Sequence, residues 1–99
     1  MLVIEEIKDK IIPIAKAYDI PKVALFGSFA RGEATEESDI DLLIERGNSS
    51  KMKGFSYFSF ELALEAALGK KIDILTYKQL ETSWLEKYAK ADEVVIYEA

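Results

Sequence analysis

The sequence predicts an α+β protein in which helices pack on a small, mixed four-stranded sheet. Apolar residues recur at helical spacing in some stretches and form short runs in others. The resulting order is helix, strand, short helix, strand, helix, strand, helix, strand. The chain has 99 residues, of which 49% are hydrophobic, and this is enough for one modest core. A single domain over residues 1–99 is therefore expected.

The first half of the chain begins with a helix over residues 2–18, where apolar side chains recur at steps of three and four. Pro13 falls inside this pattern and is expected to kink or interrupt the helix. A turn at residues 19–22 precedes a short apolar strand at residues 23–26. A short helix is expected to open near Ser28, because serine is a good N-cap residue.

Alternating polar and apolar residues predict a second strand at residues 39–45. A loop rich in Gly, Ser and Lys follows at residues 46–56. A second amphipathic helix is expected over residues 57–68, with Gly69 as its C-terminal stop. Residues 71–77 alternate again and predict the third strand, so that each alternating strand carries aspartate on one face and isoleucine on the other.

The last part of the chain predicts one more helix and a closing strand. Four residues show the helical spacing: Leu80, Trp84, Tyr88 and Ala91. The simplest interpretation of Trp84 and of the tyrosines at helical spacing is that they belong to the core, rather than to a platform on which bases stack. The apolar run at residues 93–97 is expected to form the fourth strand.

The composition excludes several kinds of functional site. The chain has no cysteine and no histidine, so it has no disulfide, no thiolate or imidazole metal ligand, and no Ser-His-Asp triad. Any metal must be bound by oxygen atoms, which favours Mg²⁺, Mn²⁺ or Ca²⁺. The net charge of −5 argues against direct binding to nucleic acid. No apolar run is long enough to span a bilayer and no signal peptide is evident, so we expect a cytoplasmic protein without membrane contact.

Three aspartates are the candidate metal ligands. Asp39 and Asp41 lie two positions apart on a predicted strand, so both side chains point from the same face, roughly 6–7 Å apart. Two carboxylates at this spacing repel each other, and a divalent cation between them removes the repulsion. Asp73 has the matching position on its own strand, so the three carboxylates converge if the two strands are neighbours. The alternatives are an ordinary turn residue for Asp39 and a solvated edge residue for Asp73.

The dipeptide Gly27-Ser28 stands where the first strand ends and the short helix is expected to open. Glycine allows the backbone to approach a ligand closely, and the start of a helix offers unpaired N–H groups to an anion. A phosphate bound at this turn and bridged by a metal to the carboxylates forms a coherent chemical unit.

These residues resemble a known signature. Gly27-Ser28, ten intervening residues and Asp39-Ile40-Asp41 resemble the G-S-x10-D-x-D motif of the DNA polymerase β-type nucleotidyltransferase superfamily. The longer segments GSFARGEATEESDIDLLIE and LGKKIDILT are similar to those of minimal nucleotidyltransferase (MNT) proteins, and the resemblance covers nearly the whole chain. It implies the polymerase β-type nucleotidyltransferase fold and a two-metal transfer of a nucleotidyl group.

The resemblance also implies roles for the individual residues. Asp39 and Asp41 bind both of two Mg²⁺ ions, and Asp73 binds the catalytic ion and helps to activate the acceptor hydroxyl. Gly27 and Ser28 hold the β- and γ-phosphates of a nucleoside triphosphate. In this scheme the metals neutralise the phosphates and stabilise the attacking and leaving oxygens of an in-line displacement.

Arg31 and Ser38 are further candidates for the nucleotide site. The guanidinium of Arg31 suits phosphate oxygens, and the equal alternative is an ion pair with Glu33 or Glu36. Ser38 is a candidate to cap or orient the turn before the aspartates, although the role of an ordinary turn residue is favoured.

The resemblance extends to a partner. MNT proteins of this kind are similar to the antitoxin half of HEPN–MNT toxin–antitoxin pairs, in which the MNT protein transfers AMP from ATP to a tyrosine of the HEPN RNase toxin and silences it. The resemblance therefore implies ATP as substrate and a HEPN toxin as partner, and the negative net charge suits a partner with a basic RNA-binding site. The alternatives are transfer to a small-molecule hydroxyl, neutralisation by binding without catalysis, and a nucleotide sensor without turnover.

Overall fold

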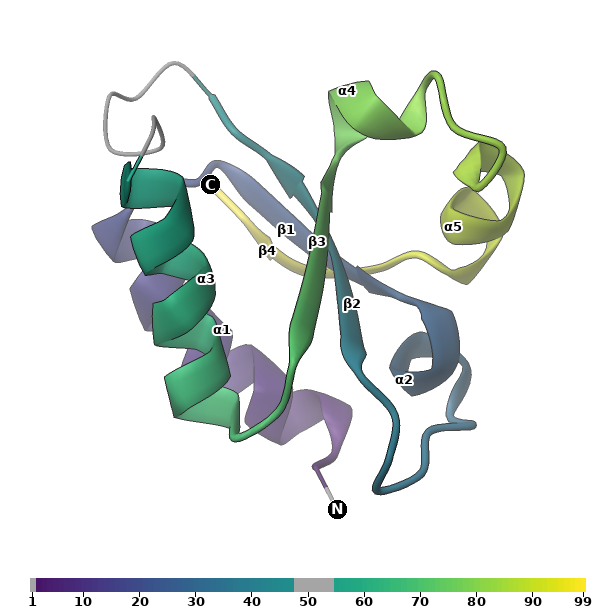
Figure 1. Cartoon of the computed structure of the whole chain (residues 1–99), viewed down its shortest axis with the longest axis horizontal. Coiled ribbons are helices and arrows are strands. Elements are labelled where there is room, and N and C mark those ends of the chain that lie inside the picture. The colour runs from purple at the N-terminus through teal and green to yellow at the C-terminus, as the bar shows by residue number, and fades with distance from the viewer. Residues whose placement is uncertain (1, 48–54) are drawn as a thin grey trace.

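The computed structural model describes residues 2–47 and 55–99, which form a four-stranded sheet with helices on both of its faces (Figure 1). In chain order the elements are α1 (Ile4–Ala17), β1 (Lys22–Phe26), α2 (Gly27–Arg31), β2 (Ile40–Glu45), α3 (Phe55–Leu68), β3 (Ile72–Thr76), α4 (Tyr77–Leu80), α5 (Glu86–Asp92) and β4 (Val94–Glu98). The predicted α+β fold class is confirmed. No helix within the two ranges is long and apolar enough to cross a membrane.

The sheet has the strand order β3-β2-β1-β4. β1 pairs antiparallel with β2 and with β4, whereas β2 and β3 run parallel, so the sheet is mixed, as predicted. The parallel register places Asp41 beside Asp73, and the antiparallel register places Phe26 beside Asp41. The end of β1 and the starts of β2 and β3 therefore meet near the two aspartates.

The first face of the sheet is covered by α1 and α3 (Figure 1). Ile40, Leu42 and Ile44 of β2 point to this face and are fully buried, because alternate residues of a strand share a face. Phe60 and Leu64 of α3 pack against them and are also fully buried. Each such side chain contributes about 1.5–3 kcal/mol on burial, and this layer is larger than the cluster that the described residues form on the other face.

The second face is covered by α4 and α5. Leu43 of β2 and Ala24 of β1 are buried there against Leu80 of α4 and Ala89 of α5. Because β2 is covered on both faces, its residues are apolar without interruption after Asp41 until the strand reaches its last residue. The second layer is small, and this leaves the start of β2 accessible from one side.

Two expectations in the first half of the chain are met only in part: the helix over residues 4–17 is not interrupted, and the short helix opens near Ser28 but is not capped by it. α1 is not interrupted at Pro13, which lies exposed inside the helix. Proline has no N–H to donate to the carbonyl of Asp9, but Asp9 is exposed, where solvent can satisfy that carbonyl. Ser28 is not the N-cap of α2, because Gly27, with a φ of 77°, turns the chain directly out of β1 and Phe26 becomes the N-cap.

The last predicted helix is split into α4 and α5 by a bend, and the prediction that its aromatic residues belong to the core is wrong. Trp84 is 80% exposed and Tyr88 is 61% exposed. Inside the bend, Ser83 Oγ accepts a hydrogen bond of 3.0 Å from the N–H of Leu85, a local bond that competes with a continuous helix. As a result, α5 buries Ala89 rather than an aromatic ring.

The other boundaries lie within two residues of those predicted, which is the usual uncertainty at the end of an element. The loop expected at residues 46–56 falls mainly on residues 48–54, which lie outside the described residues.

Candidate active site

Asp41 and Asp73 are direct neighbours across the parallel strands β2 and β3. Each is the second residue of its strand, and Asp39 lies immediately before β2. Asp41 shares a face of β2 with Leu43, so it lies on the side of the sheet that α4 and α5 cover farther along. The condition stated for convergence, that the two strands are neighbours, is met, and the register pairs Asp41 with Asp73.

Burial and neighbouring negative charges both disfavour the ionised form of Asp41. The pKa of its carboxyl is raised from 3.8 to about 6, first by burial and then by the negative charges of Asp73 and Asp39, whereas the positive charge of Arg31 lowers it. The three carboxylates therefore interact, with Asp41 in the middle. A site that raises the pKa of a carboxyl in this way stabilises positive charge placed beside it, whether a proton or a metal ion.

Gly27 is in direct contact with this carboxylate. A Cβ atom at position 27 would overlap Asp41 Oδ2 and lie 3.2 Å from its Cγ. The φ of Gly27 is 77°, in the left-handed region that favours glycine. Two independent constraints, backbone conformation and space for Asp41, thus require glycine where β1 turns into α2.

A cavity of about 530 Å³ opens beside these residues. Its polar lining comes from five residues: Gly27, Arg31, Asp41, Asp73 and Asp92. The remaining wall is mostly apolar and includes Leu75, Leu85 and Ala89, together with Tyr88. This volume lies within the range of small-molecule and cofactor sites, and the combination of few polar groups with apolar walls is typical of them.

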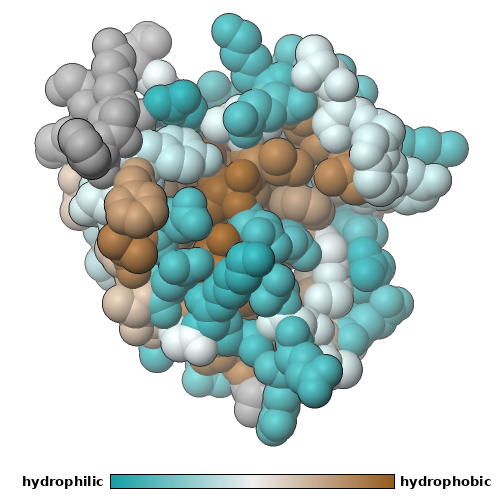
Figure 2. Space-filling model, viewed as in Figure 1, coloured by the Kyte–Doolittle hydropathy of each residue, from teal (hydrophilic) through white to brown (hydrophobic). Residues whose placement is uncertain are grey.

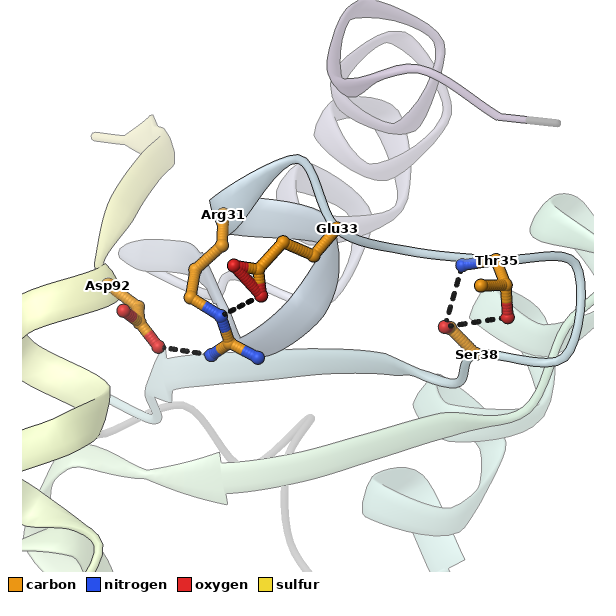
Figure 3. A network of polar contacts seen from close by, with 5 residues as sticks. All are labelled: Arg31, Glu33, Thr35, Ser38 and Asp92. Carbon is orange, nitrogen blue, oxygen red and sulfur yellow. Dashed lines mark hydrogen bonds and ion pairs between the residues drawn. The ribbon is translucent and has the colours of Figure 1, made fainter.

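Arg31 joins two elements across the cavity (Figure 3). Its Nε donates to Glu33 Oε2 at 3.0 Å, and its Nη1 donates to Asp92 Oδ2 of α5 at 2.6 Å. These hydrogen bonds, first that to Glu33 and then that to Asp92, raise the pKa of Arg31. The ion pair with Glu33, which the sequence offered as the alternative to a phosphate contact, is present; Arg31 also lines the cavity, and a contact with phosphate stays a prediction.

Ser38 closes the turn that leads into the first aspartate (Figure 3). Its Oγ accepts a hydrogen bond of 2.9 Å from the N–H of Thr35 and lies 3.4 Å from Thr35 Oγ1. This bond holds the chain where it enters β2, directly before Asp39. Ser28, the second residue of α2, is half-buried beside Gly27, and its carbonyl accepts from the N–H of Glu33 at 2.9 Å.

Comparison with known families decides the identity of this arrangement. The family model described as "Polymerase beta, Nucleotidyltransferase" matches residues 9–99. The chain belongs to this nucleotidyltransferase family. Among its relatives is MJ0435 of Methanocaldococcus jannaschii, a candidate protein adenylyltransferase, which is 43% identical over 77 residues, or 78% of this chain and 81% of the relative.

Solved structures with the same fold come from toxin–antitoxin complexes. A chain of a toxin–antitoxin crystal structure with AMP-PNP matches with a TM-score of 0.72 at 18% identity, over 93% of this chain and 73% of that chain. A chain of the complex between a tri-AMPylated Shewanella oneidensis HEPN toxin and MNT antitoxin matches with a TM-score of 0.68 at 14% identity, over 98% of this chain and 74% of that chain. These matches establish the shared fold.

The donor set of this nucleotidyltransferase fits a hard divalent cation, because it consists of carboxylate oxygens in mutual repulsion. Within residues 2–47 and 55–99, no three acidic side chains are close enough to enclose a metal ion together. Asp41 and Asp73 both line the cavity, whereas Asp39 acts on Asp41 through its charge. Joint ligation of a metal by all three aspartates therefore stays a prediction.

The contribution of α5 to the site was missed by sequence reasoning. Tyr88 and Asp92 line the cavity with Leu85 and Ala89, and their spacing along the chain is that of one helix face. That spacing was visible in the sequence. What the sequence could not show is that the bend after α4 turns this face toward Asp41.

Proposed function

We propose that this nucleotidyltransferase transfers AMP from ATP to a tyrosine hydroxyl of a HEPN-type RNase toxin and so acts as its antitoxin. The proposal is carried by one observation: Asp41, Asp73 and the Gly27 turn line a single cavity of a size suited to a nucleotide. Support comes from the similarity to a candidate protein adenylyltransferase and to chains of toxin–antitoxin complexes, one with AMP-PNP and one with a tri-AMPylated HEPN toxin.

Two Mg²⁺ ions would be held by Asp41 and Asp73, which line the cavity, and by Asp39, whose side chain would have to turn toward them. When bound, magnesium supplies charge neutralisation to the triphosphate and to the departing pyrophosphate. The β- and γ-phosphates would bind the backbone N–H groups at Gly27 and Ser28, because no side chain caps the start of α2 and these donors have no partner within the helix.

Arg31 would assist the same phosphates. Its side chain is 43% exposed and lines the cavity, and a guanidinium pairs well with phosphate oxygens. Its hydrogen bond to Asp92 restricts the rotation of the guanidinium, so that a donor group is held near the cavity before the nucleotide arrives.

The acceptor would enter beside Asp73, because β3 is an edge strand and Asp73 is exposed. The tyrosine oxygen forms a bond to the α-phosphorus of ATP, the bond between that phosphorus and the β-phosphate oxygen breaks, and pyrophosphate leaves. The tyrosine proton passes to the Asp73 carboxylate as the new bond forms. A partner with a basic surface is favoured electrostatically by the net charge of −5.

The test is a transfer reaction with the full chain, Mg²⁺, ATP labelled on the α-phosphate and a purified HEPN-family protein encoded beside it. We expect label on the HEPN protein, a mass increase of whole AMP units, and loss of label when its tyrosines near the RNase site are replaced. Asp41→Asn should abolish the transfer. Glu37→Gln, which removes an exposed acid outside the cavity, is the matched control and should leave transfer unchanged.

Two outcomes would contradict the proposal. Unlabelled HEPN protein that is nevertheless inhibited, equally by the wild-type chain and by Asp41→Asn, would assign neutralisation to binding alone. Label that appears on an added small-molecule alcohol and not on the protein would assign a different acceptor.

A further inference from the structure

Two exposed aromatic side chains stand in contact at the C-terminal side of the cavity. Trp84, in the bend before α5, is 80% exposed, and Tyr88 of α5 is 61% exposed. Their ring centroids are 6.3 Å apart with an interplanar angle of 72°, an edge-to-face arrangement that holds the orientation of both rings. A lone exposed aromatic residue needs no explanation, but two in mutual contact beside a cavity are typical of a binding surface.

The apolar part of the cavity wall is larger than a triphosphate, which is polar and charged, would contact. Leu75 lies two residues beyond Asp73 on the same side of β3, roughly 6–7 Å along the strand. It belongs to one apolar cluster with Leu85 and Ala89, and all three line the cavity. Figure 2 shows hydrophobic residues between the strands and the C-terminal helices, with more hydrophilic residues around them. A ligand that fills such a site has a charged part and a flat apolar part.

The distance between the two parts suits a nucleotide. Asp92 marks the polar part, because it holds Arg31 by a hydrogen bond of 2.6 Å. Tyr88 lies four residues earlier on α5, which is one turn away and about 6 Å along the helix axis. A ribose bridges a gap of this size between phosphates and base.

We propose that Tyr88, oriented by Trp84, is the surface on which the base of the bound nucleoside triphosphate stacks, with Leu85 and Ala89 as the adjoining wall. This inference rests on the proposed function for the position of the phosphates. Tyr88 itself lines the cavity, which favours a small planar ligand over a macromolecular partner as the occupant of its inner face. Stacking on an aromatic side chain strengthens nucleotide binding by roughly tenfold or more.

The test compares two probes by calorimetry on the full chain with Mg²⁺: AMP-PNP, which has a base, and inorganic tripolyphosphate, which has none. Tyr88→Ala is expected to weaken AMP-PNP binding by roughly tenfold or more and to leave tripolyphosphate binding unchanged. Tyr88→Phe should restore AMP-PNP binding, because it keeps the ring. Lys87→Ala, an exposed neighbour on α5 outside the cavity, is the control and should change neither affinity.

Trp84 is the one tryptophan of the chain and gives a second readout. AMP-PNP should change its fluorescence, whereas tripolyphosphate should not. Trp84→Phe should retain AMP-PNP affinity better than Trp84→Ala, as expected of a positioning residue that acts through Tyr88.

The inference is overturned if Tyr88→Ala weakens both probes equally or neither. It is also overturned if that variant binds both probes normally but no longer binds the HEPN protein, since Tyr88 is then a partner contact. A selective loss of AMP-PNP binding in Tyr88→Ala, in a chain that labels no protein, would uphold the base site and reject the proposed acceptor. A wild-type chain that binds neither probe rejects both proposals.

Discussion

Gly27 connects the two halves of the nucleotidyltransferase signature through a single contact. The glycine ends β1 and the second aspartate of the D-x-D motif stands on β2, and the two meet because Phe26 and Asp41 are paired in the antiparallel register. The Asp41 carboxylate occupies the space that a side chain at position 27 would fill. The spacing of ten residues between the two motifs is therefore the length of chain needed to form α2 and the turn that returns it to β2.

The first prediction concerns Gly27→Ala. We expect it to lower the free energy of unfolding by about 2–4 kcal/mol, because it combines an unfavourable backbone conformation with overlap against Asp41. Displacement of that carboxylate should also abolish Mg²⁺-dependent AMP-PNP binding. Denaturant unfolding and calorimetry measure the two effects.

Gly32→Ala is the matched control for this change. Gly32 has a similar φ of 74°, but a Cβ atom there would meet nothing within 4 Å. It should lower stability by about 1–2 kcal/mol through backbone strain alone and should leave AMP-PNP binding intact. Equal effects of the two substitutions on binding would show that contact with Asp41 does not shape the site.

The second prediction is a pH dependence of stability that comes from Asp41. Its pKa is about 6 in the folded chain and 3.8 in the reference state, so the folded state binds a proton more tightly between these values. In metal-depleted buffer the contribution of Asp41 therefore destabilises the fold progressively as pH rises from about 4 to about 6, and the loss is complete above that. After allowance for solvent screening, we expect the free energy of unfolding to fall by about 1–2 kcal/mol over this pH range.

Denaturant unfolding of the wild-type chain and of Asp41→Asn at several pH values checks this prediction. The variant should be the more stable of the two at pH 7, and the difference should vanish near pH 4. Glu37→Gln, a change of the same kind at an exposed position, should show no such pH-dependent difference in stability from the wild type. An Asp41→Asn variant that is less stable than the wild type at pH 7 would mean that the carboxylate has a structural role.

At the scale of elements, the sequence was informative where one pattern determined the outcome. Alternation placed Asp41 and Asp73 on matching positions of their strands, and the parallel register of β2 and β3, which alternation alone does not determine, brings them side by side. Prediction from the sequence failed where local hydrogen bonding competed with the periodicity of apolar residues. Leu80 to Ala91 keep helical spacing, but a bend that includes the hydrogen bond from Leu85 N–H to Ser83 Oγ separates α4 from α5, and Trp84 in this bend is exposed.

The third prediction concerns the link between α2 and α5. Asp92→Asn should reduce both stability and AMP-PNP affinity, the latter several-fold, because the Asp92 side chain is 19% exposed and its hydrogen bond orients Arg31. Glu33→Gln removes the other partner of Arg31, but the Glu33 side chain is 64% exposed and should matter less on both counts. Unfolding and calorimetry would contradict this ranking if the two variants behaved alike.

At the scale of the whole molecule, the two faces of the sheet are packed by hydrophobic clusters of different size, and the site lies on the side with the smaller cluster. Among the residues that the structure describes, one face of the sheet has the large cluster under α1 and α3, and the other has the small cluster under α4 and α5. The cavity lies beside the small cluster and takes residues from β2, β3, α2 and α5. A ligand in the cavity therefore adds contacts where the fold itself has few.

The fourth prediction follows from this arrangement. Mg²⁺ with AMP-PNP at about 100 times its dissociation constant should stabilise the folded chain by about 2.7 kcal/mol, since the unfolded chain has no such site. In a domain of 99 residues that corresponds to a rise in melting temperature of roughly 10–20 °C. Removal of Mg²⁺ with EDTA, or Asp41→Asn, should abolish the rise, and Glu37→Gln should retain it. A rise of the same size without Mg²⁺ would show that the nucleotide binds independently of the carboxylates, because two bare carboxylates repel a triphosphate unless a cation stands between them.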